Sequence, residues 1–198
     1  MRNLYGFLVT TILTCAFVAP GNCVNAQTKS FAREGVTELS GSVSFQSFTE
    51  VDNDQSGDAT TFFSFAPQVG YFVSDGFELG LQTGIALIPG LSIVTPPRGD
   101  ATTVFQFFLA PSYNVVTPDG KVYPFVEAQI GYTSASSGNS SLTGFSYGAR
   151  GGLKIPVVEH LLVSTSLQYL AITLNPERAT KRNGFNYFAF GVGVSGYF

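Results

Sequence analysis

The stretch from Gly184 to Phe198 reads GFNYFAFGVGVSGYF and carries the strongest structural signal in this chain. Every second residue, counted back from the end, belongs to an apolar set: Phe198, Gly196, Val194, Val192, Phe190 and Phe188. The residues between them are small or amphipathic: Tyr197, Ser195, Gly193, Gly191, Ala189 and Tyr187. Because side chains alternate between the two faces of a strand, this period of two predicts one long strand with a continuous apolar face.

Seven earlier segments alternate in the same way, with turn signals between them. Together they predict eight strands, at residues 37–48, 60–73, 77–88, 102–116, 121–133, 142–157, 160–173 and 185–198. Three connections are short, at 74–76, 117–120 and 158–159, and two of these contain Asp-Gly. The other four connections are longer: 49–59, 89–101, 134–141 and 174–184. This alternation predicts an all-β fold, an eight-stranded antiparallel up-and-down transmembrane β-barrel.

Four prolines interrupt the predicted strands: Pro67, Pro111, Pro124 and Pro156. Proline has no backbone N–H to give to a neighbouring strand, and a closed barrel has no free edge. We therefore expect bulges or local breaks at these positions.

The first 26 residues have the pattern of a secretory signal peptide. Arg2 precedes an apolar run over residues 4–19, and Val24-Asn25-Ala26 forms an A-x-A-like cleavage site. Cleavage there would leave residues 27–198 as one barrel domain. Both cysteines, Cys15 and Cys23, lie in the leader, so the mature chain is expected to have no disulfide and no thiol chemistry.

Charge is scarce throughout the chain. Removal of Arg2 with the leader leaves nine basic and thirteen acidic side chains, so the formal net charge goes from −3 to −4. No basic patch suggests a nucleic-acid partner. Charged residues make up 12% of the sequence, about half the share of soluble domains. A water-facing wall of Gly, Ser and Gln would be unusually uncharged. We therefore expect the polar face to line the interior; a soluble lipocalin-like carrier of apolar ligands is the alternative, with the faces reversed.

This pattern resembles the small bacterial outer-membrane barrels, namely the OmpX-like proteins and the transmembrane domain of OmpA, over residues 37–198. The resemblance rests on the architecture and on the terminal Phe198. It implies location in the Gram-negative outer membrane, contact with its lipid, a monomer, and Phe198 as a signal to the barrel assembly machinery. Gly196 departs from the family, which usually has a bulky residue there.

Five ionisable residues fall on the predicted inner face: Glu38, Glu78, Glu127, Arg150 and Lys154. Opposite charges enclosed together are expected to pair, because an unpaired buried charge is costly. The interior of an eight-stranded barrel is only wide enough for side chains. We therefore predict a largely plugged lumen and a structural or surface-interaction role through the extracellular loops. The alternative is a narrow gated channel at the Glu127–Arg150 region.

Enzymatic chemistry has little support in the sequence. Outer-membrane lipid-modifying enzymes use a histidine near the outer leaflet, whereas His160 adjoins a predicted short turn on the opposite rim. A serine without such a base is not activated. We therefore predict a protein that is not an enzyme and that needs no cofactor.

Two predicted loops have notable charge. Residues 52–58, DNDQSGD, resemble the first half of a calcium loop, but the twelfth position holds Phe63 in place of a glutamate. The sequence therefore favours an acidic extracellular loop over a metal site there. Arg178, Lys181 and Arg182 make the last long loop basic, so it is a candidate for contact with lipopolysaccharide phosphates.

Overall fold

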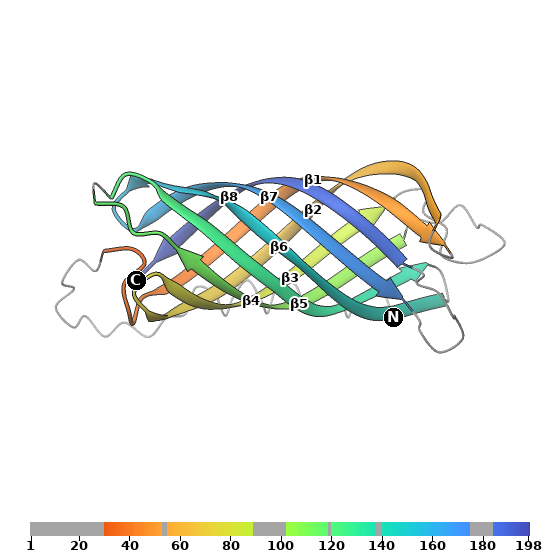
Figure 1. The fold of residues 1–198 in the computed structure, drawn as a ribbon, viewed down its shortest axis with the longest axis horizontal. Helices are drawn as coiled ribbons and strands as arrows, with labels where there is room; N and C mark the ends of the chain where they lie inside the picture. Colours follow the sequence, from red (N-terminus) through yellow and green to blue (C-terminus); the bar gives the residue numbers. More distant parts are fainter. Residues whose placement is uncertain (1–29, 53–54, 89–101, 119, 138–139, 175–183) are drawn as a thin grey trace, which may run out of the picture.

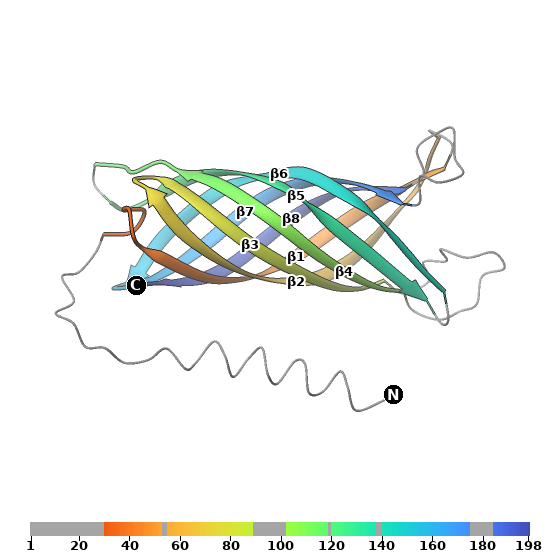
Figure 2. The ribbon, with the colours of Figure 1, turned by 90° about the horizontal axis from the view of Figure 1, so that it is seen from below.

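The protein forms a closed antiparallel barrel in which each strand pairs with its neighbours in sequence (Figures 1 and 2). The structure, a computed structural model, describes residues 30–52, 55–88, 102–118, 120–137, 140–174 and 184–198. The eight strands are β1 (Thr37–Asp52), β2 (Gln55–Ser74), β3 (Phe77–Ile88), β4 (Thr102–Asn114), β5 (Tyr123–Ser137), β6 (Ser140–Val158), β7 (Leu161–Leu174) and β8 (Gly184–Tyr197). The predicted fold class is confirmed. The described residues contain no helix long and apolar enough to cross a membrane.

Strand β8 closes the barrel against β1. Its register runs from Glu38 opposite Tyr197 to Val51 opposite Gly184. Phe198 extends this pairing, because its backbone N–H donates to Thr37 O at 3.0 Å and its carbonyl accepts from Thr37 N–H at 2.9 Å. The last segment of the sequence is therefore the seam of the barrel.

The two ends of the barrel differ in their connections. At one end, here called the short-turn end, β2 joins β3 through residues 75–76 and β6 joins β7 through residues 159–160. The β4–β5 connection at this end is longer than predicted, since β4 stops at Asn114 and β5 starts at Tyr123. One bond still joins them beyond the strands, from Val115 N–H to Pro124 O at 2.7 Å. The opposite end is called the loop end.

The prediction of long loops is wrong for two connections at the loop end. The segment expected as loop 49–59 is mostly strand, with Val51 opposite Ser56 beyond a bulge at residues 49–51. The segment expected as loop 134–141 is also mostly strand, because β5 continues to Ser137 and β6 begins at Ser140. These residues are polar on both faces, so apolar alternation does not mark them, but an antiparallel ladder needs only backbone groups. The other two predicted loops lie largely outside the described residues.

Three of the four prolines interrupt the ladder, as predicted. At Pro67 the pairing of β2 with β3 skips two positions and then resumes in the same register. Pro111 has the same effect on the pairing of β4 with β5. Pro156 adjoins a register shift in the pairing of β6 with β7. The pairing of Pro124 with Leu153 is uninterrupted, so no break occurs there.

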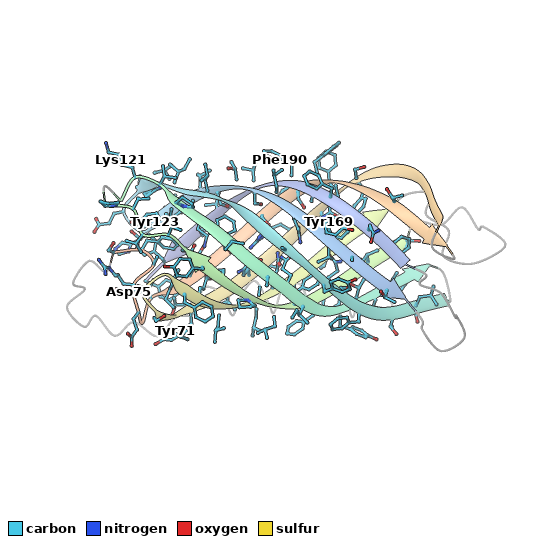
Figure 3. All side chains as sticks on the ribbon, viewed as in Figure 1. Tyr71, Asp75, Lys121, Tyr123, Tyr169 and Phe190 are labelled. Carbon is cyan, nitrogen blue, oxygen red and sulfur yellow. The ribbon has the colours of Figure 1, made fainter. Side chains whose placement is uncertain are left out.

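The apolar face points outward and the polar face inward. Phe63 on β2 is 67% exposed, whereas Gln129 on β5 is fully buried. Figure 3 places Tyr71 and Phe190 on the outer wall. The orientation is the reverse of what a lipocalin-like carrier requires. An outer band of exposed aromatic and aliphatic side chains around a polar interior suits a lipid environment.

Apolar side chains form a cluster in the interior at each end of the barrel. Near the loop end, inward residues form one cluster: Phe62, Ala86, Val104, Phe108, Ala135, Leu170, Ile172, Phe185, Tyr187 and Ala189. Near the short-turn end a second cluster contains Phe31, Ala32, Val36, Phe72, Tyr123 and Leu162. Three of these residues precede β1, in a segment that turns into the mouth of the barrel. The polar residues of the lumen lie between the two clusters.

Candidate lumen charge network

Strand geometry brings all five predicted charged residues into the lumen. Glu38 lies on β1, Glu78 on β3 and Glu127 on β5, while Arg150 and Lys154 lie four residues apart on β6. Residues four apart on a strand share a face. Glu127 is directly opposite Arg150 in the β5–β6 ladder, and the three glutamates are each at most 2% exposed.

Glu127 and Arg150 form the centre of one group. Arg150 Nη2 donates to Glu127 Oε2 at 2.8 Å and to Gln68 Oε1 at 2.6 Å. The amide nitrogens of Gln68 and Gln129 also donate to the carboxylate, at 3.0 Å and 2.9 Å. Gln129 also donates to Gln82. One hydrogen-bonded layer thus includes side chains from four strands, β2, β3, β5 and β6. Such a layer satisfies a buried carboxylate that would otherwise be costly.

Lys154 is the centre of a second group, nearer the short-turn end. Its Nζ is 2.6 Å from Glu38 Oε2 and 3.5 Å from Glu78 Oε2. Ser112 and Asn114 donate to the same Glu78 oxygen, at 2.9 Å and 3.3 Å. The chain reaches across the barrel here, since Lys154 and Glu38 are on strands that do not pair. This group therefore ties β1, β3, β4 and β6 together.

Gly70 makes room for the second group. A Cβ at this position would lie 1.6 Å from Glu78 Oε1, inside the carboxylate. The glutamate side chain therefore folds flat over the β2 backbone, which only a residue without a side chain permits.

Two small cavities lie inside the described part of the barrel. One cavity of about 20 Å³ is lined by serines and glutamines together with Arg150, and a second of about 20 Å³ is lined mainly by the apolar cluster at the loop end. A cavity needs roughly 10–15 Å³ to hold one water molecule. Arg150 Nε is among the buried polar atoms without a protein partner, so the first cavity is suited to a water molecule beside it. The arrangement supports charge pairing and local hydration inside the barrel.

His160 lies in the turn between β6 and β7, at the short-turn end. Its Nδ1 is 3.1 Å from Tyr197 O, its φ is 64°, and its side chain is 42% exposed. Glu159 Oε1 lies 3.7 Å from Nε2. These contacts place the ring in the turn, against the backbone of Tyr197 and the side chain of Glu159.

The other predicted site residues are placed only in part. Phe198 is 65% exposed on the outer wall, and Gly196 has space for a larger side chain, because an added Cβ would meet only His160 O, at 3.7 Å. Arg178, Lys181 and Arg182 lie outside the described residues. Residues 53–54 of the proposed calcium loop also lie outside, and the rest of residues 52–58 is known only as backbone. No group of three or more metal-binding side chains occurs in the described part of the chain.

Sequence reasoning missed the residues that close the short-turn end. Phe31 is 1% exposed and contacts three aromatic rings inside the barrel. It lies between the predicted leader and the first strand, where no periodicity marks it. The sequence marks it only as an isolated aromatic residue four positions before Gly35.

Comparison with solved structures identifies the architecture. The chain has the fold of the small eight-stranded outer-membrane barrels, as predicted. Neisserial surface protein A superposes with a TM-score of 0.63 at 13% identity, over 82% of this chain and 99% of that one. OprG from Pseudomonas aeruginosa gives 0.56 at 12%, over 84% and 97%. AlkL in DMPC bilayers gives 0.54 at 15%, over 90% and 97%. No protein-family model matches, and neither does any curated protein.

Proposed function

We propose that this chain is an integral outer-membrane barrel whose lumen is closed to ions and solutes and whose activity resides in its surface loops. The short-turn end faces the periplasm in this arrangement, and the loop end faces outward. The similarity to the outer-membrane proteins OprG and AlkL, and to the Neisserial surface protein NspA, supports the location. The exposed apolar band supports contact with lipid.

The observation that carries the closed lumen is the charge network between two apolar clusters. An ion crossing the barrel would have to displace the Glu127–Arg150 pair, which is held by amides from neighbouring strands. It would also have to pass rings at both ends, where Phe72 and Phe108 are at most 2% exposed. Each barrier excludes the water that a permeant ion needs.

Conductance in planar lipid bilayers tests this proposal. We expect neither the purified wild-type barrel nor the Glu127→Gln variant to show stepwise current, because the apolar clusters remain in both. The positive control for a barrel able to conduct removes a ring from each cluster together with the charge pair: Phe72→Ala, Phe108→Ala, Glu127→Gln and Arg150→Ala. Steps in the wild type that disappear on Arg150→Lys would instead establish a narrow channel through the network.

The basic segment with Arg178, Lys181 and Arg182 is proposed to bind lipopolysaccharide phosphates, because guanidinium and ammonium groups pair with phosphate. The double variant Lys181→Glu with Arg182→Glu is expected to weaken binding to purified lipopolysaccharide. Lys121→Glu, at the other end of the barrel, is the control for a charge reversal elsewhere on the protein. Equal binding by all three proteins would remove this role.

A further inference from the structure

Residues 30–36 turn back into the short-turn end of the barrel and are called here the plug. In Figure 2 this segment curls beside the C-terminal end of β8. Its backbone reverses at Ala32 and Gly35, where φ is 63° and 80°. The left-handed conformation disfavours a residue that has a Cβ, such as Ala32. Tertiary packing, rather than local preference, therefore holds the plug in this shape.

Phe31 is the part of the plug that fills the barrel. Its ring meets Phe72, Tyr123 and Tyr197 edge-on, with centroids 5.3, 4.9 and 5.3 Å away. Lys154 Nζ lies 5.1 Å from the Phe31 ring centroid. The ring therefore covers the charged group formed by Lys154, Glu38 and Glu78 and separates it from the nearer opening of the barrel. Figure 3 shows Tyr123 and Asp75 at this end.

The plug is held to the β2–β3 turn by an exposed ion pair and by two hydrogen bonds from backbone N–H groups. Arg33 Nη1 is 2.6 Å from Asp75 Oδ2, and the two side chains are 53% and 55% exposed. The backbone N–H of Glu34 donates to Asp75 Oδ1 at 3.0 Å, and Gly76 N–H donates to Ala32 O at 2.8 Å. Exposed ion pairs are weak and easily screened. The latch is thus far weaker than the barrel that it closes.

We propose that the plug is a water gate at the short-turn end: it opens when the Arg33–Asp75 latch releases and Phe31 withdraws, and it then exposes Glu38, Lys154 and Glu78 to the aqueous phase. The plug lies outside the eight strands, but its last two residues are bonded to β2, by Gly35 N–H to Phe72 O at 2.8 Å and by Phe72 N–H to Val36 O at 2.9 Å. Withdrawal of Phe31 therefore needs residues 30–34 to move while these two bonds stay in place. The gate concerns one end of the barrel only. A lumen closed to ions and a gated short-turn end can therefore be true or false independently.

Single cysteine reporters test the gate, because both natural cysteines lie in the predicted leader. Ser195 is 2% exposed and inward, two residues from Tyr197, so Ser195→Cys reports water at the charged group. Ser146→Cys reports the interior nearer the loop end, where Ser146 is fully buried. The mature protein is purified in detergent, its mass and heat-dependent gel shift are checked, and the rate of reaction with a small methanethiosulfonate is measured.

Phe31→Ala is expected to raise the labelling rate of Ser195→Cys by about ten-fold or more, and Arg33→Ala is expected to raise it by a smaller factor. Labelling of Ser146→Cys should not change in either variant. Phe65→Ala removes the same atoms from the outer wall and is the matched control. If Phe31→Ala does not fold, Arg33→Ala alone decides. Unchanged Ser195→Cys rates in folded variants, or equal increases at both reporters, would overturn the gate.

Discussion

Arg150 is the residue on which the lumen network depends most. Its removal leaves Glu127 as a buried carboxylate with amide donors but no cation. Breaking one side of a buried pair costs about 3–5 kcal/mol. We therefore expect Arg150→Ala to lower the free energy of unfolding by roughly that amount in denaturant titrations in detergent or lipid.

A double-mutant cycle tests whether Glu127 and Arg150 act as a pair or independently. Adding Glu127→Gln to Arg150→Ala removes the stranded charge, so part of the lost stability should return. Glu127 and Arg150 act independently if the two losses simply add, and that result would contradict the pairing.

Gly70 gives a second prediction at the scale of one residue. Gly70→Ala would push the Glu78 carboxylate out of its contacts with Lys154 and Ser112, because the new Cβ occupies its place. Overpacking of this kind costs about 1–3 kcal/mol. Gly41→Ala is the matched control in the same sheet, since its Cβ would lie an ordinary 3.4 Å from Phe65. Equal stabilities of the two variants would show that Glu78 does not need its present position.

The turn between β2 and β3 makes the plug sensitive to acid. The pKa of Asp75 is lowered, first by the hydrogen bond from Glu34 N–H and then by Arg33. A carboxyl group whose folded-state pKa is lowered stabilises the fold above its unfolded pKa of about 3.9 and loses that effect as the pH falls through the folded value. The latch is therefore complete at neutral pH.

This dependence can be measured as the difference in melting temperature between the wild type and Asp75→Ala. We expect a constant difference above about pH 5 that shrinks as the pH falls below the unfolded pKa of about 3.9. A difference that grows on acidification would contradict the lowered pKa.

Strand β8 carries the predicted assembly signal. Phe198 pairs with Thr37 through its backbone alone, so Phe198→Ala keeps the seam and removes only the exposed ring. We expect less folded barrel in the outer membrane, with the thermal stability of the folded fraction unchanged. Phe190→Ala, on the same face of β8 and 50% exposed, is the control. Equal yields of the two variants would remove the special role of the last residue.

Whether the ends of a strand could be predicted depends on the polarity of its two faces. Strands whose two faces differ in polarity, such as β3, begin and end where alternation predicts. The extensions of β1, β2, β5 and β6 could not be found in this way, because both faces there are polar and the ladder is held by backbone groups. The plug was missed for a related reason: Phe31 is placed by packing against residues far away in sequence, and no local pattern encodes that.

At the scale of the whole molecule, the alternation of apolar and polar residues along each strand predicted which charged residues share the lumen. Partners were harder to predict. Glu127 and Arg150 adjoin in the ladder, whereas Lys154 and Glu38 are 116 residues apart and meet only by reaching across the interior. Closure of the barrel brings them within contact distance, because the interior of an eight-stranded barrel is only wide enough for side chains.

The central claim is a folded barrel with its apolar face in the outer-membrane lipid. The most direct test is the gel mobility of the detergent-extracted outer-membrane fraction, with and without boiling. We expect the protein to be found in that fraction and to give a faster-migrating band in the unboiled sample. Recovery as a soluble periplasmic protein, with no shift on boiling, would contradict it.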